Sequence, residues 1–177
     1  MAAVTPKAHA WWVLCVLVLA LPLSACAPAP SGADSKRLFV IERSLNANIV
    51  VYDAVRGKDG RLDPAHPVAA YWLLKAAKGQ RQELNPIEEM LAYGFDVGNE
   101  PGGRVTITLK ALRDRPIRVQ TDGRRVLALT RIAGREAVLR RVFVQTDKDN
   151  PLGVRYIELF GQDLRDRTPV HERITRG

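Results

Sequence analysis

Arg-Val-Thr-Ile-Thr-Leu-Lys-Ala, residues 104–111, alternates polar and apolar side chains at every position. Because successive side chains of a β-strand point to opposite faces of a sheet, this order predicts a strand with one buried and one solvent-facing side. The alternation continues through 117–121, where Arg118 and Gln120 share the polar side. The pattern favours an antiparallel sheet with one face in water.

Further strands are indicated on both sides of this stretch. Asp122-Gly123 is typical of a two-residue hairpin turn, and Ala133-Gly134 separates the next two apolar runs. Residues 68–76 are ambiguous, because their alanines and leucines suit a helix whereas Tyr71-Trp72 suits a buried strand, and we interpret them as a strand. The predicted strands are 38–43, 49–55, 68–76, 104–111, 117–121, 126–132, 136–145, 154–160 and 168–175.

One short helix is predicted at 85–92. Asn85 can cap the first free N–H groups, and Pro86 suits the first helical position because no donor is needed there. Gly94 is expected to end the helix. Two turns are too few to form a layer, so the fold is predicted to be mainly β. We expect an antiparallel meander, closed as a barrel or folded as a sandwich, with this one helix plugging or flanking the sheet.

The first residues of the chain have the order of a secretory signal peptide. A short basic-leaning start precedes an apolar run at 10–21, which is shorter than the roughly 20 residues that span a bilayer. Proline, glycine and serine at 27–36 indicate a linker with no apolar face to bury. The predicted parts are a signal peptide at 1–25, a flexible linker at 26–36 and a single β-rich domain at 37–177.

Leu23-Ser24-Ala25-Cys26 resembles the lipobox of bacterial lipoproteins. The resemblance implies cleavage before Cys26, a diacylglycerol on its sulfur and, in many bacteria, a further acyl chain such as palmitate on the new amino terminus. Two or three acyl chains hold a protein stably at a membrane, which one chain does only marginally. The alternative is a free cysteine after an ordinary cleavage site; Cys15 would leave with the signal peptide, which excludes a disulfide with Cys26.

The residue after the lipobox cysteine bears on location. Aspartate at that position commonly retains lipoproteins at the inner membrane, and this chain has Ala27. The resemblance therefore implies a lipoprotein of the cell envelope, anchored in the outer membrane and facing the periplasm, if the source has two membranes.

Several stretches of the folded part carry a second resemblance. They include Phe39-Val40-Ile41-Glu42-Arg43-Ser44, 50–53, 67–72, 92–94 and Val154-Arg155-Tyr156-Ile157-Glu158-Leu159-Phe160-Gly161. In these stretches the chain resembles an uncharacterised bacterial domain family that is found largely in secreted proteins and lipoproteins. The resemblance covers nearly all of the chain from Leu38 onwards and implies no established activity.

The chain is basic, with a formal net charge of +8. Removing residues 1–25 takes away one of the 27 basic residues and none of the 19 acidic ones, which leaves +7. Nucleic acid is a poor partner outside the cytoplasm, so the charge suggests anionic lipid or an acidic envelope polymer. Arg104, Lys110 and Arg118 are predicted to form a basic face on one side of the sheet. Such a face could instead protect a sheet edge against aggregation, or be simply solvated.

A polar cluster is the second candidate site. Glu42, Asp53 and Glu158 lie within otherwise apolar strands, where an unpaired buried charge would be costly. If they point inward they must meet arginines such as Arg43 or Arg155, or a ligand, and a carboxylate pair could serve acid–base chemistry. Alternatively, these side chains face water or form structural ion pairs.

Catalytic and metal motifs are missing from the sequence. Ser44 with His66 or His171 could form a triad, but no G-x-S-x-G turn surrounds the serine. The two histidines after residue 25 lie far apart and no cysteine pair accompanies them, so neither a metal site nor a cofactor is predicted. We favour a lipid-anchored binding or structural domain, with no identified protein partner. The alternatives are a carrier of small apolar ligands with a pocket inside a barrel, and a cell-envelope hydrolase.

Overall fold

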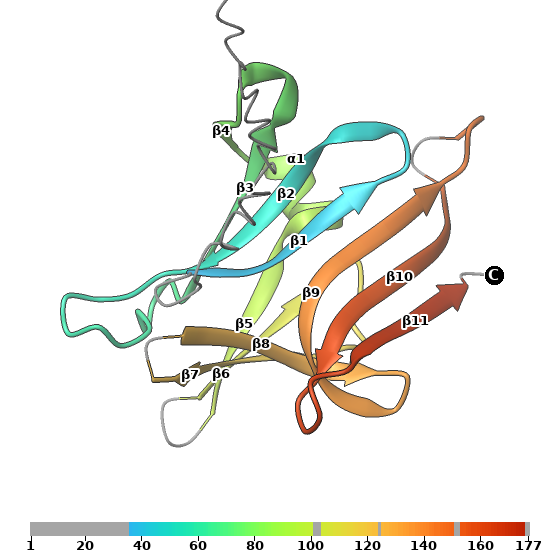
Figure 1. Ribbon diagram of the computed structural model, residues 1–177. Helices are drawn as coiled ribbons and strands as arrows, with labels where there is room; N and C mark the ends of the chain where they lie inside the picture. Colours follow the sequence, from blue (N-terminus) through green and yellow to red (C-terminus); the bar gives the residue numbers. More distant parts are fainter. Residues whose placement is uncertain (1–35, 101–103, 124, 151–152, 176–177) are drawn as a thin grey trace, which may run out of the picture. The chain divides into compact units, whose positions relative to one another are not determined.

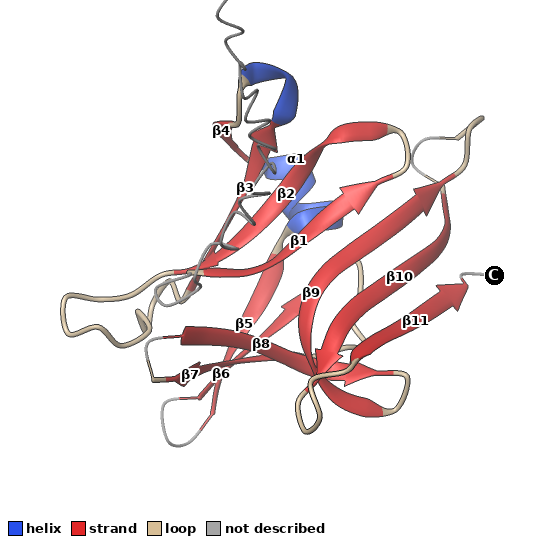
Figure 2. Cartoon of the chain, viewed as in Figure 1, coloured by secondary structure: helices blue, strands red, loops and turns tan. Residues whose placement is uncertain are grey.

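The computed structural model describes residues 36–100, 104–123, 125–150 and 153–175 (Figures 1 and 2). The predicted signal peptide, Cys26 and all but the last residue of the predicted linker lie outside the described residues. Within the described residues, no helix is long and apolar enough to span a bilayer. The strands are β1 Arg37–Arg43, β2 Asn46–Ala54, β3 Val68–Leu74, β4 Gln80–Glu83, β5 Phe95–Glu100, β6 Arg104–Leu109, β7 Ile117–Asp122, β8 Arg125–Ile132, β9 Arg135–Thr146, β10 Val154–Asp163 and β11 Pro169–Thr175, and the helical turns are η2 Lys75–Ala77, α1 Pro86–Glu88 and η3 Glu89–Tyr93.

The strands form one mixed sheet that curls strongly into a half-barrel (Figure 1). Its order is β4-β3-β2-β1-β9-β8-β7-β6-β5, and β10 pairs with both β9 and β11. Strand β9 joins two arms of the sheet, one formed by β1 to β4 and the other by β5 to β8. Its first half pairs with β8, and its second half runs parallel to β1. The prediction of a mainly β fold with one short helix is confirmed. The parallel pairing of β1 with β9 is a departure from a pure meander, in which only consecutive strands pair.

The inner faces of the curled sheet meet in one apolar core. Phe39 and Tyr52 are fully buried there and stack with ring centroids 4.4 Å apart. The Tyr52 hydroxyl donates a hydrogen bond of 2.6 Å to the Tyr93 carbonyl, and burial raises the pKa of this phenol. Buried apolar side chains from every strand except β4 and β5 fill this space together with them, so the core is packed.

The structure also settles the ambiguous elements. Residues 68–74 form strand β3, as interpreted, and Ala133 and Gly134 make the predicted turn with φ of 50° and 77°. Strands β4 and β5 are additions to the prediction. Their sequences, Gln-Arg-Gln-Glu and Phe-Asp-Val-Gly-Asn-Glu, lack a regular apolar alternation because each is the last strand of its arm of the sheet.

The predicted helix bridges the two ends of the strand order, since it connects β4 to β5. The Asn85 side chain accepts from the Glu88 N–H at 2.9 Å, and the Glu88 carboxylate accepts from the Asn85 N–H at 3.0 Å. This capping box fixes where the helix begins. After one turn of α-helix the chain continues as a π-helical turn. A Cβ on Gly94 would lie 1.9 Å from the Glu89 carbonyl oxygen, so only glycine can close that turn.

Candidate functional site

An arginine-lined groove of about 990 Å³ lies on the described part of the chain. Its walls come from the β6–β7 connection, strands β7 and β8, the β8–β9 turn and the β10–β11 connection, which only the curled sheet brings together. The charged residues that line it are Arg115, Arg118, Arg131, Arg135 and Arg165, with Asp114, Glu136, Asp163 and Asp166.

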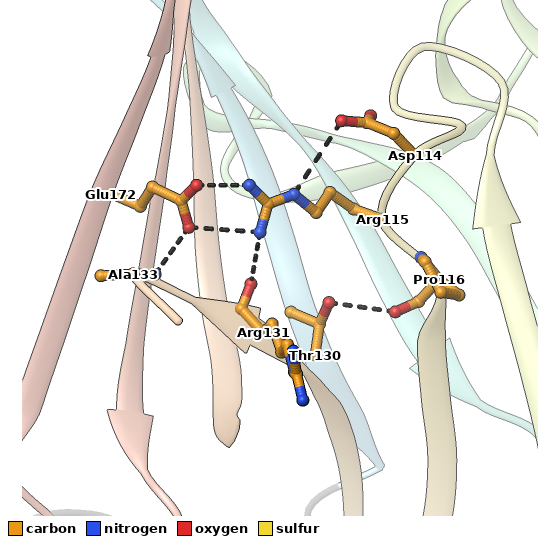
Figure 3. A network of polar contacts seen from close by, with 7 residues as sticks. All are labelled: Asp114, Arg115, Pro116, Thr130, Arg131, Ala133 and Glu172. Carbon is orange, nitrogen blue, oxygen red and sulfur yellow. Dashed lines mark hydrogen bonds and ion pairs between the residues drawn. The ribbon is translucent and has the colours of Figure 1, made fainter. Parts of the chain in front are cut away.

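A network of polar contacts centred on Arg115 builds one wall (Figure 3). The Arg115 guanidinium makes a forked contact with both carboxylate oxygens of Glu172 on β11, and it donates to the Arg131 carbonyl at 3.0 Å. Glu172 also accepts from the Ala133 N–H at 2.6 Å. Close by, the Thr130 hydroxyl donates to the Pro116 carbonyl at 3.0 Å. The network therefore ties the β6–β7 connection, the β8–β9 turn and β11 into one rigid wall.

The remaining arginines of the groove differ in whether a carboxylate lies within ion-pair distance of the guanidinium. Arg118 forms an ion pair with Glu136, and Arg135 lies 3.7 Å from Asp163. The exposed guanidiniums of Arg131 and Arg165 have no carboxylate within ion-pair distance in the described chain. The buried Nε of Arg118 has no hydrogen-bond acceptor among the described residues. The groove consequently keeps two guanidiniums without a carboxylate partner among the described residues, while its five arginines and four carboxylates give the lining a formal charge of 5 − 4 = +1.

A second group of arginines, which does not line the groove, consists of Arg125, Arg140 and Arg167. Burial, and then repulsion from Arg125 and Arg167, hold the pKa of the Arg140 guanidinium below its usual value. Arg140 is the extra residue of a β-bulge in β9. Phe160 of β10 pairs with Arg141 and the next residue, Gly161, pairs with Leu139, so Arg140 has no partner residue in β10. The bulge thus turns one more guanidinium toward like charges.

Comparison with known proteins identifies the domain family. Residues 39–173 match the family model described as Domain of unknown function (DUF4833). The chain belongs to this family. No curated protein and no solved structure matches it significantly. Membership of DUF4833 agrees with the predicted resemblance to an uncharacterised domain family, and it leaves function to be argued from the site.

In this DUF4833 domain two residues of the predicted basic face, Arg104 and Arg118, lie on the same side of the sheet, since Arg118 pairs with Thr106, two residues along β6 from Arg104. Arg118 lies in the arginine-lined groove. Lys110 forms an ion pair with Asp96 at another, smaller groove, and Arg104 is exposed beside a third depression. Each of the three cations thus borders a different depression, although Arg104 and Arg118 share a face.

The predicted polar cluster is likewise distributed over several places. Asp53 is buried on the outer side of β2, where it accepts from the Tyr71 hydroxyl at 2.7 Å and from Arg37 Nε at 2.8 Å. Arg43 donates to the Tyr93 hydroxyl at 3.3 Å. Arg155 is an exposed residue of β10. The cations beside Asp53 are thus not the two that the sequence suggested.

Glu42 and Glu158 share one face of the sheet in the DUF4833 domain. Glu42 accepts from Arg141 at 3.0 Å, and the Arg141 guanidinium lies 3.8 Å from the centre of the Phe160 ring. Phe160 stacks on His171, which contacts Glu158 at 3.0 Å. Hydrogen bonding to Arg173 lowers the pKa of Glu158, which keeps this carboxylate ionised. Each carboxylate is matched by a cation, an arrangement that stabilises a sheet face without requiring a ligand.

No catalytic constellation emerges from these contacts in the described residues. The Ser44 hydroxyl lies 3.0 Å from the Thr146 hydroxyl and accepts from the Thr146 N–H, so it joins β1 to β9. Within the described ranges no three histidine, cysteine, aspartate or glutamate side chains gather in a way that could hold a metal ion.

Four arginines of the groove, at positions 115, 131, 135 and 165, were not predicted as site residues. They belong to three segments that are distant in sequence, because Arg131 and Arg135 flank the same turn, and none lies in a recognisable motif. The available signal was the density of arginine in the turns, at 113–118, 131–135 and 165–167. Composition of the turns, rather than periodicity of the strands, would have indicated them.

Proposed function

We propose that this protein is a lipid-anchored binding module of the cell envelope that recognises anionic groups through its arginine-lined groove. The observation that carries the proposal is the pair of exposed guanidiniums, Arg131 and Arg165, without carboxylate partners in the described chain, in a groove of about 990 Å³. We favour binding over catalysis because the groove offers donors and positive charge but no recognisable nucleophile and base.

The chemistry of arginine favours phosphate or carboxylate as the recognised group. A guanidinium presents donors in a fixed planar fork that matches two oxygens of such an anion. The Arg115 network holds the backbone of Arg131 in place, so that its exposed side chain projects from a rigid support. Phosphate groups of lipid headgroups and of envelope polymers share this chemistry.

Anchoring is the second part of the proposal and is supported by the sequence pattern alone. Cys26 would carry the acyl chains after removal of residues 1–25, and Ala27 favours the outer membrane, with the domain facing the periplasm. Intact-mass measurement of the protein extracted from its own membrane tests this part. Acyl groups on a chain that begins at Cys26 are expected, and a full-length or unmodified chain would contradict it.

Binding is tested on the mature chain with Cys26→Ser. The probes are a short polyphosphate and vesicles of phosphatidylcholine with or without phosphatidylglycerol, which separate a soluble phosphate polymer from a lipid headgroup. Arg131→Glu with Arg165→Glu is expected to weaken binding at least tenfold, since each surface cation contributes about 1 kcal/mol toward an anionic surface. The matched control, Arg104→Glu with Arg155→Glu, makes the same charge change outside the groove.

The two pairs of variants decide between a site and general attraction. A loss confined to the groove pair supports the proposal. Equal losses in both pairs would mean that only net charge matters, and no loss in the groove pair would refute a site there. Native mass spectrometry of the extracted protein addresses the carrier alternative, which predicts a retained non-protein mass besides the acyl chains on Cys26.

A further inference from the structure

The helix that bridges the two ends of the strand order has an exposed apolar face. Ile87, Met90 and Leu91 are 65%, 64% and 65% exposed. Their spacing of three and four residues places them on one side of the helix. Large aliphatic side chains gathered on one exposed face mark a contact surface far more often than single exposed ones do.

This exposed face belongs to a helix that is firmly held on its other side. The Trp72 indole N–H donates to the Glu88 carboxylate at 3.1 Å, and Trp72 meets Tyr93 edge to face at 5.1 Å. The Asn85 capping box uses the same carboxylate. The apolar face is therefore presented by a fixed helix and is not the result of a frayed end.

The exposed face continues into a groove of about 470 Å³. Met90 lines this groove together with Val68 of β3, Leu84, Pro86 and Phe95 of β5. Glu89 and Lys110 line the groove as well, so the apolar face of the helix continues into a groove of mixed apolar and charged character.

The folded domain begins close to this surface. The Lys36 carbonyl accepts from the Ala54 N–H at 2.7 Å, and Ala54 pairs with Val68, a residue of the groove. Two strand spacings of about 4.8 Å place the start of the domain roughly 10 Å from Val68. The residues between Cys26 and Lys36 can span at most about 35 Å when fully extended.

We propose that Ile87, Met90 and Leu91 dock into the surface of the membrane that holds the anchor. The inference rests on the lipid anchor of the proposed function for its location. A tether that short and that close to the helix keeps this face within reach of the bilayer, and aliphatic side chains on a fixed helix suit the boundary between headgroups and acyl chains. Lys75 and Lys78, exposed in the connection before β4, add positive charge that anionic headgroups would attract.

The test attaches the mature chain to vesicles through Cys26, which is its one cysteine, by a maleimide-bearing lipid. This coupling makes the result independent of whether cells acylate Cys26, which intact mass measures separately. Leu91→Trp provides a fluorescent reporter in vesicles whose acyl chains carry bromine, a contact quencher. Leu45→Trp, at an exposed position of the β1–β2 turn, is the matched control.

Quenching of the reporter at position 91, with none at position 45, is the expected result. No quenching at 91, or equal quenching at both positions, overturns the proposal. In the uncoupled chain with Cys26→Ser, Ile87→Ser with Leu91→Ser should lower vesicle partitioning about tenfold per side chain. Leu45→Ser with Val97→Ser, two other exposed aliphatics, should leave it unchanged. The face would instead be assigned to a second copy of the chain by one pair of results. These are no quenching at position 91, together with concentration-dependent self-association that Ile87→Ser with Leu91→Ser abolishes.

Discussion

Arg115→Ala should destabilise the domain more than any exposed arginine does. The change removes the forked contact with Glu172 and the hydrogen bond to the Arg131 carbonyl. A hydrogen bond involving a charged group contributes about 1.5–3 kcal/mol, and the Arg115 and Glu172 side chains are only 24% and 19% exposed, which limits screening. In this variant Glu172 still accepts the hydrogen bond from the Ala133 N–H and is not left without a partner. We therefore expect a loss of about 2–3 kcal/mol in the free energy of unfolding.

A double-mutant cycle with Glu172→Ala measures the pair itself. The double variant should be less destabilised than the sum of the two single variants by about 1.5–2 kcal/mol, because either single change already removes the forked contact. Urea unfolding provides the free energies, and the melting temperature of Arg115→Ala should fall by about 10 °C in a domain of this size. Arg113→Ala, an exposed neighbour in the same connection, is the control and should stay within about 0.5 kcal/mol of the parent. Additive single effects, or an Arg115→Ala cost equal to that of Arg113→Ala, would refute the role assigned to this network.

Two further predictions concern the helix and the charged sheet face. Gly94→Ala should lower the free energy of unfolding in urea by about 3 kcal/mol, because the new Cβ would lie 1.9 Å from the Glu89 carbonyl oxygen. Gly98→Ala is the control, since a Cβ there meets nothing closer than 3.7 Å. Equal losses in the two variants would contradict the packing argument. Hydrogen bonding to Arg173 lowers the pKa of Glu158 in the folded state, so its stabilisation is present above the ordinary value of 4.5 and is lost as pH falls through the folded-state value. The stability advantage of the parent over Glu158→Gln should therefore disappear in acid, and an advantage that is independent of pH would exclude this linkage.

The arginine-lined groove and the apolar helix face suggest a division of labour on one small domain. The helix face would orient the domain at the bilayer, and the groove would then be available to phosphate-bearing groups in the envelope. The two surfaces use different chemistry, so their variants should be separable: salt should weaken binding at the groove and leave docking of the aliphatic side chains largely unaffected.

Local patterns in the sequence were reliable where one element determines its own conformation. The alternation at 104–109 is strand β6, with Val105, Ile107 and Leu109 buried. The cap predicted at Asn85 is present with its reciprocal Glu88 contact. These features depend on side-chain direction and on backbone groups within a few residues, which is why the sequence alone predicted them.

Pairing between distant segments could not be read in the same way. Strand β5, whose residues 96–99 are exposed, takes its place through antiparallel pairing with β6, and the parallel pairing of β1 with β9 joins Val40 to Arg141. No periodicity specifies such partners. Likewise, Glu42 and Glu158 were recognised as charges in apolar strands, but which cations they meet depends on the register of neighbouring strands.

The sequence by itself thus determined a mainly β domain with one capped helix, and the resemblance of 23–26 to a lipobox predicts the anchor on Cys26. The tertiary structure decided that the sheet curls into a half-barrel, that arginines from separate turns line one groove, and that Ile87, Met90 and Leu91 remain exposed. The physical reason is that backbone propensity and alternation act over a few residues. The surfaces available for binding arise from contacts between segments that meet only after the chain has folded.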